Sequence, residues 1–398
     1  MYPKMDFVAL LQPDIQKYIL DKTGSDISKL ALQKNPFPEI DFKIILNQIE
    51  LRSKSAAKLP TWFDGKNIIY PSKISIEQTS SEITAKYKST LVSGDALIDL
   101  TGGFGVDDYY FSKKIKSVYH CEINAELSEI VAHNFNCFGI TNASFFAEDS
   151  LDVLKKLNKK FDWIYIDPSR RNDAKGKVFM LKDCLPNVPD LLEIYFQYSN
   201  NILIKTAPIL DITAGLYELT FVKTIHIIAV DNEVKELLWE IENHYSKGIA
   251  IKTVNFNKNK KEVFEFEFNS DTTSNYSLPK KYLYEPNSAI MKSGGFSEIG
   301  STFSLDKLHQ HSHLYTSDEL VDFPGRIFEI NDQFDYSNGT MKSNFKGEKS
   351  NITTRNFPET VENIRKKWNI KDGGNQYSFF TTNKNEDKIV LLCNQIKF

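Results

Sequence analysis

Apolar residues recur at three- and four-residue spacing through the first 58 residues, which is the period of amphipathic helices. The stretches "DFVALLQPDIQKYIL" and "FKIILNQIELRSKSAAKL" carry this pattern, and the prolines at 36 and 38 interrupt it. The pattern predicts a small helical lead-in. The following "WFDGKNIIYP" contains Asp64-Gly65 and predicts a short hairpin. Serine and threonine caps in "SIEQTSSEITAKYKSTLV" then predict a helix.

From about residue 96 the pattern becomes an alternation of short apolar strands and amphipathic helices. Strands are predicted at "ALIDL", "SVYHCEI", "ASFFAED", "FDWIYID" and "NILIKTAPIL". The segment "FVKTIHIIAVDNEVKELLWEI" predicts a sixth strand followed by a helix. Two more strands, "GIAIKTVNF" and "EVFEFEF", flank a lysine-rich turn, and an antiparallel strand is expected near residue 265. The alternation indicates an α/β fold with a parallel sheet covered on both faces.

A polar stretch, "NSDTTSNYSLPKK", marks a boundary near residues 270–281. The apolar pattern on its far side predicts two small α+β units. We therefore expect four regions, at residues 1–74, 75–275, 281–325 and 326–398.

Composition and charge narrow the class of protein. A chain of 398 residues with 41% hydrophobic and 25% charged residues is typical of a globular protein with two or three domains. A formal net charge of −3 argues against binding nucleic acid by bulk positive charge. The four cysteines form no CxxC pair, no apolar stretch suits a membrane span, and the first residues do not resemble a secretory signal. We expect a cytoplasmic protein with reduced cysteines and no membrane association, and leave its oligomeric state open.

The stretch "LIDLTGGFGVDD" places a glycine-rich loop directly after the first predicted strand. In an α/β unit this loop meets the start of the next helix, where free backbone amides and the helix dipole favour negative charge. The dinucleotide fingerprint would need a third glycine at Asp108, so NAD is disfavoured. A purely structural tight turn is the alternative. The candidate ligand-binding residues of the loop are Asp99, Thr101, Gly102, Gly103, Phe104 and Gly105.

Polar residues also end the later strands. Glu122, followed by Ile123, ends the second strand and is placed to accept hydrogen bonds from ribose hydroxyls. Asp149, followed by Ser150, ends the third strand and suits either an adenine amine or a helix cap. Ligands on open α/β sheets bind at the carboxyl ends of the strands, so these residues and the loop are expected to face one crevice.

The fourth strand ends at "DPSRR", residues 167–171, and the fifth contains Lys205. Arginine pairs two phosphate oxygens at once, so Arg170 and Arg171 are candidate phosphate contacts, with a surface ion pair as the alternative. Lys205 is a further candidate for the same crevice, with a structural role at the strand end as the alternative.

These residues carry a family resemblance. Residues 75–270 resemble a class I S-adenosylmethionine-dependent methyltransferase, with "DLTGGFG" as its first motif. The whole chain resembles the bacterial methyltransferases that carry a THUMP-like C-terminal domain. The supporting segments are "EQTSSEITAKYK", "DLTGGFGVD", "DPSRR", "KTAPILDI", "YLYEPNSAIMKSGGF" and "TTRNFPETVENIRKKWNIKDGG".

The resemblance implies a Rossmann-like seven-stranded sheet, a helical lead-in, a ferredoxin-like unit and a THUMP-like module associated with RNA binding. S-adenosylmethionine is then the cofactor. Asp167 and the carbonyl of Pro168 are expected to orient an amine acceptor, with Arg170 beside them. Methyltransferases of exocyclic base amines commonly have (D/N)-P-P-(Y/F/W), and Asp-Pro-Ser-Arg departs from that motif, so base N-methylation is suggested by position alone.

The function expected is therefore methylation of an rRNA or tRNA base nitrogen. The alternatives are methylation of a small molecule or protein, and a noncatalytic protein that binds S-adenosylmethionine and RNA. The alternating histidines in "HQHSH", residues 309–313, could form a zinc site on a strand, but no cysteine or acidic cluster accompanies them and no metal is expected.

Overall fold

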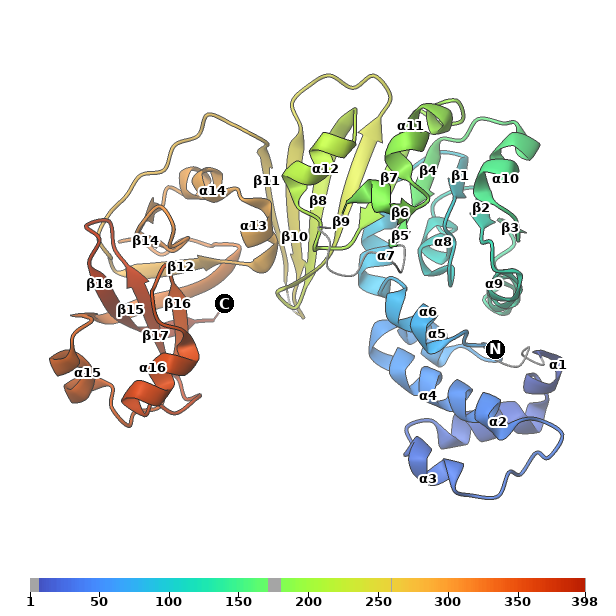
Figure 1. Ribbon diagram of the computed structural model, residues 1–398, viewed down its shortest axis with the longest axis horizontal. Helices are drawn as coiled ribbons and strands as arrows, with labels where there is room; N and C mark the ends of the chain where they lie inside the picture. Colours follow the sequence, from blue (N-terminus) through green and yellow to red (C-terminus); the bar gives the residue numbers. More distant parts are fainter. Residues whose placement is uncertain (1–6, 171–179, 259, 398) are drawn as a thin grey trace. The chain divides into compact units, whose positions relative to one another are not determined.

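The computed structural model describes residues 7–170, 180–258 and 260–397, apart from the side chains of Phe7 and Arg170. The chain forms two compact units. The first comprises residues 1–222 and 239–245, and the second comprises residues 223–238 and 246–398 (Figure 1). Each unit is described separately below.

The first unit begins with seven helices in the described residues, and the first five of them lie within residues 1–74, the region predicted to be helical. They are α1 (Phe7–Leu10), α2 (Pro13–Lys22), α3 (Ile27–Ala31), α4 (Phe42–Lys58), α5 (Pro60–Asp64), α6 (Lys73–Gln78) and α7 (Glu82–Ser89). The Asp41 carboxylate caps α4 by accepting a hydrogen bond from the Lys43 amide. Apolar residues of α4 share one core with Phe104 and with α8 and α9, described next, so the helical region packs against the α/β part of its unit.

The predicted hairpin around Asp64-Gly65 is wrong. Residues 60–64 form helix α5, with Pro60 in its first turn, where a missing amide hydrogen costs nothing. Gly65 ends that helix with an ordinary φ of −65° instead of the left-handed conformation that a hairpin turn needs.

Nine strands follow one another in the order β11-β10-β8-β9-β7-β4-β1-β2-β3. Their bounds are β1 (Ala96–Asp99), β2 (Ser117–Cys121), β3 (Ala143–Phe146), β4 (Trp163–Ile166), β7 (Asn201–Thr206), β8 (Val222–Val230), β9 (Glu233–Glu242), β10 (Ala250–Phe256) and β11 (Lys261–Glu267). Neighbours among β3, β2, β1, β4 and β7 pair in parallel. The expected α/β, Rossmann-like sheet with a helical lead-in is therefore confirmed, but the sheet has nine strands where seven were expected.

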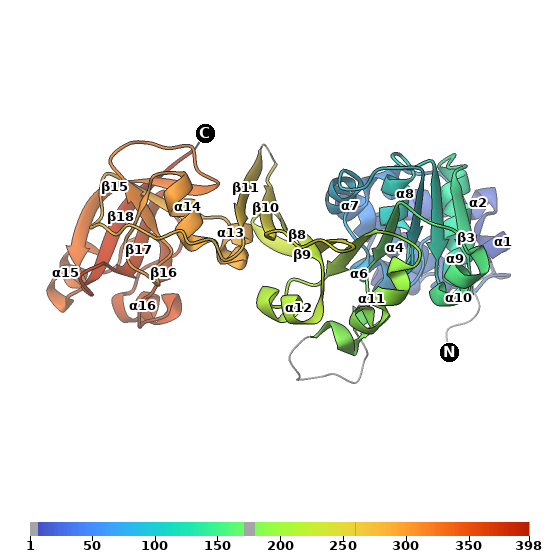
Figure 2. The ribbon, with the colours of Figure 1, turned by 90° about the horizontal axis from the view of Figure 1, so that it is seen from above.

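Helices connect the strands. The alternating pattern predicted α8 (Val106–Phe111), α9 (Ala125–Cys137) and α10 (Ser150–Leu157). The structure adds α11 (Val188–Phe196) and α12 (Ile212–Glu218), which were not predicted from the sequence. Figure 2 shows α7 and α8 on one face of the sheet and α11 and α12 on the other. Between β4 and α11 lie the two-residue strands β5 (Ser169–Arg170) and β6 (Cys184–Leu185), which pair with each other.

The helix predicted after the sixth strand is wrong, because residues 233–242 form strand β9. Two residues, Asp231 and Asn232, join β8 to β9, and both have positive φ, 49° and 62°. Such a pair is typical of the type I′ hairpin turn, so β8 and β9 run antiparallel. The strand near residue 265 is as predicted, since β11 pairs antiparallel with β10.

The second unit contains a seven-stranded sheet in the order β13-β14-β12-β15-β18-β17-β16. Its elements are β12 (Tyr282–Pro286), α13 (Ser288–Ser293), α14 (Phe296–Thr302), β13 (Asp306–Lys307), β14 (Tyr315–Ser317), β15 (Gly325–Asp335), α15 (Asn338–Asn344), β16 (Asn351–Arg355), α16 (Val361–Trp368), β17 (Gln376–Thr382) and β18 (Lys388–Ile396). Leu283, Leu308 and Leu314 share a core with Phe328 and Phe379, so the regions on either side of residue 325 share a sheet and a core.

The buried carboxylate of Glu285 on β12 contacts both the neighbouring strand β15 and the edge strand β16. It forms ion pairs with Arg326 on β15 and Arg355 on β16.

Within the described ranges, no helix has both the length and the hydropathy to cross a membrane.

Candidate functional site

The carboxyl ends of β1, β2, β4 and β7 lie next to one another because these strands are adjacent and parallel. Asp99 ends β1, Glu122 follows β2, Asp167 follows β4, and Lys205 lies near the end of β7. The topology thus brings the predicted site residues of four strands to one sheet edge, as their positions along the sequence indicated.

Two of the three glycines in the loop after β1 are required by the protein's own packing. A Cβ on Gly102 would lie 2.2 Å from the His120 ring, and one on Gly105, where φ is +72°, would lie 2.5 Å from Val131. Gly103 also has a positive φ, +54°, but the nearest atom to its added Cβ is the Thr101 carbonyl oxygen at 3.7 Å. Of the three loop glycines, Gly103 is therefore the one where an added Cβ would meet no close neighbour.

Phe104, another predicted ligand residue, is buried and faces the helical core. Its ring centroid lies 6.0 Å from that of Trp62 and 6.4 Å from that of Tyr70. Its side chain therefore serves packing, and only its backbone remains for a ligand.

The Glu122 carboxylate holds the glycine loop. One oxygen accepts a hydrogen bond from the Gly103 amide at 3.1 Å, and the other accepts from the Asn124 amide at 2.8 Å. Ile123 beside it is 75% exposed. A carboxylate oxygen accepts more than one hydrogen bond, so Glu122 can hold the loop and still meet hydroxyl groups at the open edge.

Asp149 and Ser150 lie at the start of α10. One oxygen of the Asp149 carboxylate accepts hydrogen bonds from the amides of Leu151, at 2.9 Å, and Asp152, at 3.4 Å, and Ser150 is the first residue of the helix. The structure thus gives Asp149 the capping contacts that the sequence offered as one of two roles.

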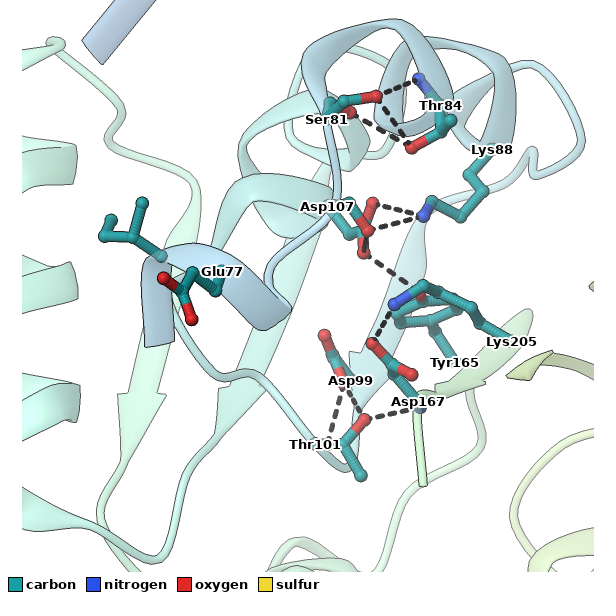
Figure 3. Close-up of polar contacts among 12 residues, drawn as sticks. Glu77, Ser81, Thr84, Lys88, Asp99, Thr101, Asp107, Tyr165, Asp167 and Lys205 are labelled. Atoms are coloured by element: carbon teal, nitrogen blue, oxygen red, sulfur yellow. Dashed lines mark hydrogen bonds and ion pairs between the residues drawn. The ribbon is translucent and has the colours of Figure 1, made fainter. Parts of the chain in front are cut away.

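Asp167 is tied to both the glycine loop and β7. Its amide donates to Thr101 Oγ1 at 2.6 Å, and one of its carboxylate oxygens, Oδ2, lies 2.5 Å from Lys205 Nζ (Figure 3). Thr101 in turn donates from its amide and hydroxyl to Asp99 Oδ1, at 2.7 and 3.1 Å. The loop and the end of β4 are therefore one hydrogen-bonded assembly.

The remaining residues of the "DPSRR" segment are only partly described. Pro168 follows Asp167, and the backbone of Arg170 pairs with Cys184 in the short β5-β6 ladder. The Arg170 side chain and all of Arg171 lie outside the described residues. Their expected phosphate contacts stay predictions.

Sequence reasoning missed a buried polar network behind this edge. The Asp107 carboxylate accepts hydrogen bonds from Ser80 and Tyr165, at 2.7 and 2.9 Å, and lies 3.0 Å from Lys88 Nζ. Burial raises the pKa of Asp107, but the charges of Lys88 and Lys205 outweigh it and leave that pKa below its usual value. The available signal was an acid in the first turn of the helix that follows the loop.

A second buried group lies beneath Gly102. His120 Nδ1 and Asp108 Oδ2 are 2.6 Å apart, and both side chains are fully buried. Burial raises the pKa values of Asp99 and Asp108 well above the usual range and lowers the pKa of His120. These groups support the loop from inside the protein, and Asp99 contributes through its bonds to Thr101.

Of the histidines in "HQHSH", His309 and His313 have separate surroundings in the second unit. His309 lies 2.8 Å from Glu386 and 2.9 Å from Asn356, whereas His313 stacks on Phe296 with ring centroids 3.6 Å apart. Across the described part of the chain, no group of three metal-ligating side chains occurs.

Comparison with known proteins identifies two family models in the second unit. Residues 282–324 match a ferredoxin-like domain and residues 325–395 a THUMP domain-like family. The chain is also similar from end to end to a putative methyltransferase from Porphyromonas gingivalis W83, with 27% identity, 99% of this chain and 100% of that chain covered, and a TM-score of 0.86.

Weaker matches cover only part of the chain. One is TrmK of M. capricolum in complex with S-adenosyl-homocysteine, with 18% identity, 41% of this chain and 70% of that chain covered, and a TM-score of 0.33. Another is an rRNA methylase from Streptococcus thermophilus, with 12% identity, coverage of 40% and 94%, and a TM-score of 0.30. No curated protein matches the chain.

Proposed function

We propose that this chain is an S-adenosylmethionine-dependent methyltransferase that modifies a base nitrogen of rRNA or tRNA in the cytoplasm. The observation that carries the proposal is the hydrogen-bonded edge formed by Gly103, Glu122, Thr101 and Asp167. The similarity over 99% of the chain to a protein described as a putative methyltransferase supports it.

The residues at the edge fit an adenosyl donor. Gly103 has no side chain, and the nearest atom to an added Cβ is the Thr101 carbonyl oxygen at 3.7 Å, so a ligand can approach this backbone closely. Glu122 has acceptor capacity for the two ribose hydroxyls, in addition to the amides it already binds. The donor supplies an activated methyl group when it is bound. This chain's residues hold the loop and fix the acceptor.

Asp167 is the residue best placed to meet an amine acceptor. Its carboxylate is partly exposed, with 32% of its side chain accessible, while Thr101 fixes its backbone against the donor loop. An amine N–H that donates to Asp167 has its lone pair oriented, and the carboxylate can take the proton that the amine loses. The carbonyl of Pro168 is a second acceptor for the same amine.

RNA is the favoured acceptor because residues 325–395 match a THUMP domain-like family and because Arg170 and Arg171 follow Asp167. The segment "DPSRR" lacks the aromatic residue of the (D/N)-P-P-(Y/F/W) motif. Methylation of a small molecule or a protein is the second candidate, and a noncatalytic protein that binds donor and RNA is the third.

Two measurements test the proposal. Modified nucleosides are compared by mass spectrometry in RNA from cells that lack the protein, that carry it, and that carry Asp167→Asn. One methylated nucleoside should disappear in the first and third and persist in the second. Calorimetry should show that Asp167→Asn still binds S-adenosylmethionine. If the wild-type protein binds no donor, or if all three RNAs are identical, the proposal is wrong.

A further inference from the structure

Four side chains of alternating charge lead from the interior of the first unit to the candidate site. Lys88 is fully buried, Asp107 is 8% exposed, and the side chains of Lys205 and Asp167 are 12% and 32% exposed. Lys88 pairs with Asp107, and Lys205 pairs with Asp167 (Figure 3). The positive charge of Lys205 also helps Lys88 to hold the pKa of Asp107 below its usual value. The series therefore ends at the acceptor side of the proposed crevice.

This arrangement changes the role expected for Lys205. Its ammonium lies 2.5 Å from Asp167 Oδ2 and is mostly buried, so it is poorly placed to clamp a phosphate as well. Lys205 holds Oδ2 and Thr101 holds the backbone, so the Asp167 carboxylate is fixed in place. Among the residues described, none donates a hydrogen bond to the other oxygen, Oδ1, which is the oxygen we assign to the acceptor.

We infer that Lys205 is a positioning residue, which fixes the Asp167 carboxylate for the acceptor and balances its negative charge beside the donor. The inference rests on the proposed function. Without Lys205, the negative charges of Asp107 and Asp167 would favour a cationic sulfonium over a neutral thioether. Lys205 offsets part of that charge, so the wild-type site should prefer the sulfonium less strongly.

The first test uses the two adenosyl compounds that differ in this charge. Calorimetry compares the affinities of S-adenosylmethionine and S-adenosylhomocysteine for the wild type, Lys205→Met, Lys205→Arg and the control Lys116→Met, which removes an exposed lysine paired with Asp95. Lys205→Met should shift the affinity ratio toward the sulfonium by about tenfold, whereas the other two variants should keep the wild-type ratio. A structural defect alone would weaken both compounds equally. An unchanged ratio in Lys205→Met overturns the inference.

The second test separates positioning from phosphate binding. Initial rates are measured with RNA isolated from cells that lack the protein. Lys205→Met should lower kcat about 100-fold and leave KM for RNA nearly unchanged, and Lys205→Arg should recover much of the loss. In an Asp167→Asn background, Lys205→Met should add less than a further twofold, because the residue to be positioned is already altered.

The outcomes are distinct from failure of the proposed function. A wild-type protein that binds neither adenosyl compound refutes the proposed function itself. A wild type that binds both, with Lys205→Met raising mainly KM for RNA in a salt-dependent way, assigns Lys205 to phosphate binding and overturns positioning.

Discussion

Substituting Gly103 by alanine separates what the glycine loop needs for folding from what it needs for a ligand. Gly103 has a φ of +54°, and the nearest atom to the added methyl is 3.7 Å away. The folded protein therefore meets only the cost of a left-handed alanine, roughly 1 kcal/mol. That corresponds to a fall in melting temperature of about 2–4 °C for a unit of this size. If the donor lies against the loop, the methyl group meets it directly, which costs about 1–3 kcal/mol of binding, or roughly 5- to 150-fold in affinity.

Gly139→Ala is the matched control. Gly139 follows α9, has a φ of +68°, and has no atom within 4 Å of an added Cβ, so it carries the same backbone cost away from the site. Melting curves should place the two variants within about 1 °C of each other, and calorimetry should show a loss of S-adenosylmethionine affinity only in Gly103→Ala. If both variants bind the donor as the wild type does, the donor does not approach this loop and the assignment of the site is refuted.

Three further predictions concern other residues. Glu285→Gln removes the buried negative charge that pairs with Arg326 and Arg355, so it should destabilise the second unit by about 2–3 kcal/mol. Hydrogen exchange in β12 and β15 should become faster while donor affinity stays unchanged. Unchanged hydrogen exchange would contradict this prediction. Asp149→Asn keeps the cap of α10, so the variant should have near wild-type stability and donor affinity. Asp149→Ala removes the cap and should lower the unfolding free energy by about 1 kcal/mol in urea denaturation. A tenfold loss of donor affinity in Asp149→Asn would instead indicate that Asp149 contacts adenine. Burial lowers the pKa of His313 to about 4, so the folded state keeps the ring neutral while the unfolded chain takes up a proton below about 6.5. The unfolding free energy should therefore fall by about 1 kcal/mol between pH 6.5 and 4, allowing for solvent screening, and His313→Asn should lose this dependence in urea titrations; an identical dependence in both proteins would exclude His313 as its source.

The strand-end residues of the site could be predicted from sequence because parallel topology alone brings strand ends together. Asp99, Glu122 and Asp167 each follow a continuous apolar stretch, and such stretches in alternation with helices leave few arrangements for the sheet. The exchange of helix for strand at residues 233–242 has a local cause. The segment "EVKELLWEIE" is rich in helix-forming residues, and the Asp231-Asn232 turn that makes it a hairpin was the stronger signal.

The buried charges could not be predicted in the same way. Lys88 lies in a polar helix segment, "EITAKYKS", where a lysine is normally solvated, and only the position of Asp107 across the α7-α8 contact explains its burial. Gly102 is a similar case. From the sequence, a glycine at this position suggests that a ligand approaches the backbone, whereas in the structure the His120 ring occupies the space beside it.

The continuous sheet of the second unit bears on how this protein can be cut and how it can evolve. Strand β15 hydrogen-bonds to β12 on one side and to β18 on the other, and leucines from residues 282–324 complete the core lined by Phe328 and Phe379. A fragment ending at residue 324 would lack β15, the neighbour of β12, and would lack the Phe328 and Phe379 side chains of that core. The ferredoxin-like and THUMP-like segments should therefore be inherited, expressed and lost together. Either segment placed in another protein should fold only if a strand of that protein takes the place of the missing neighbour.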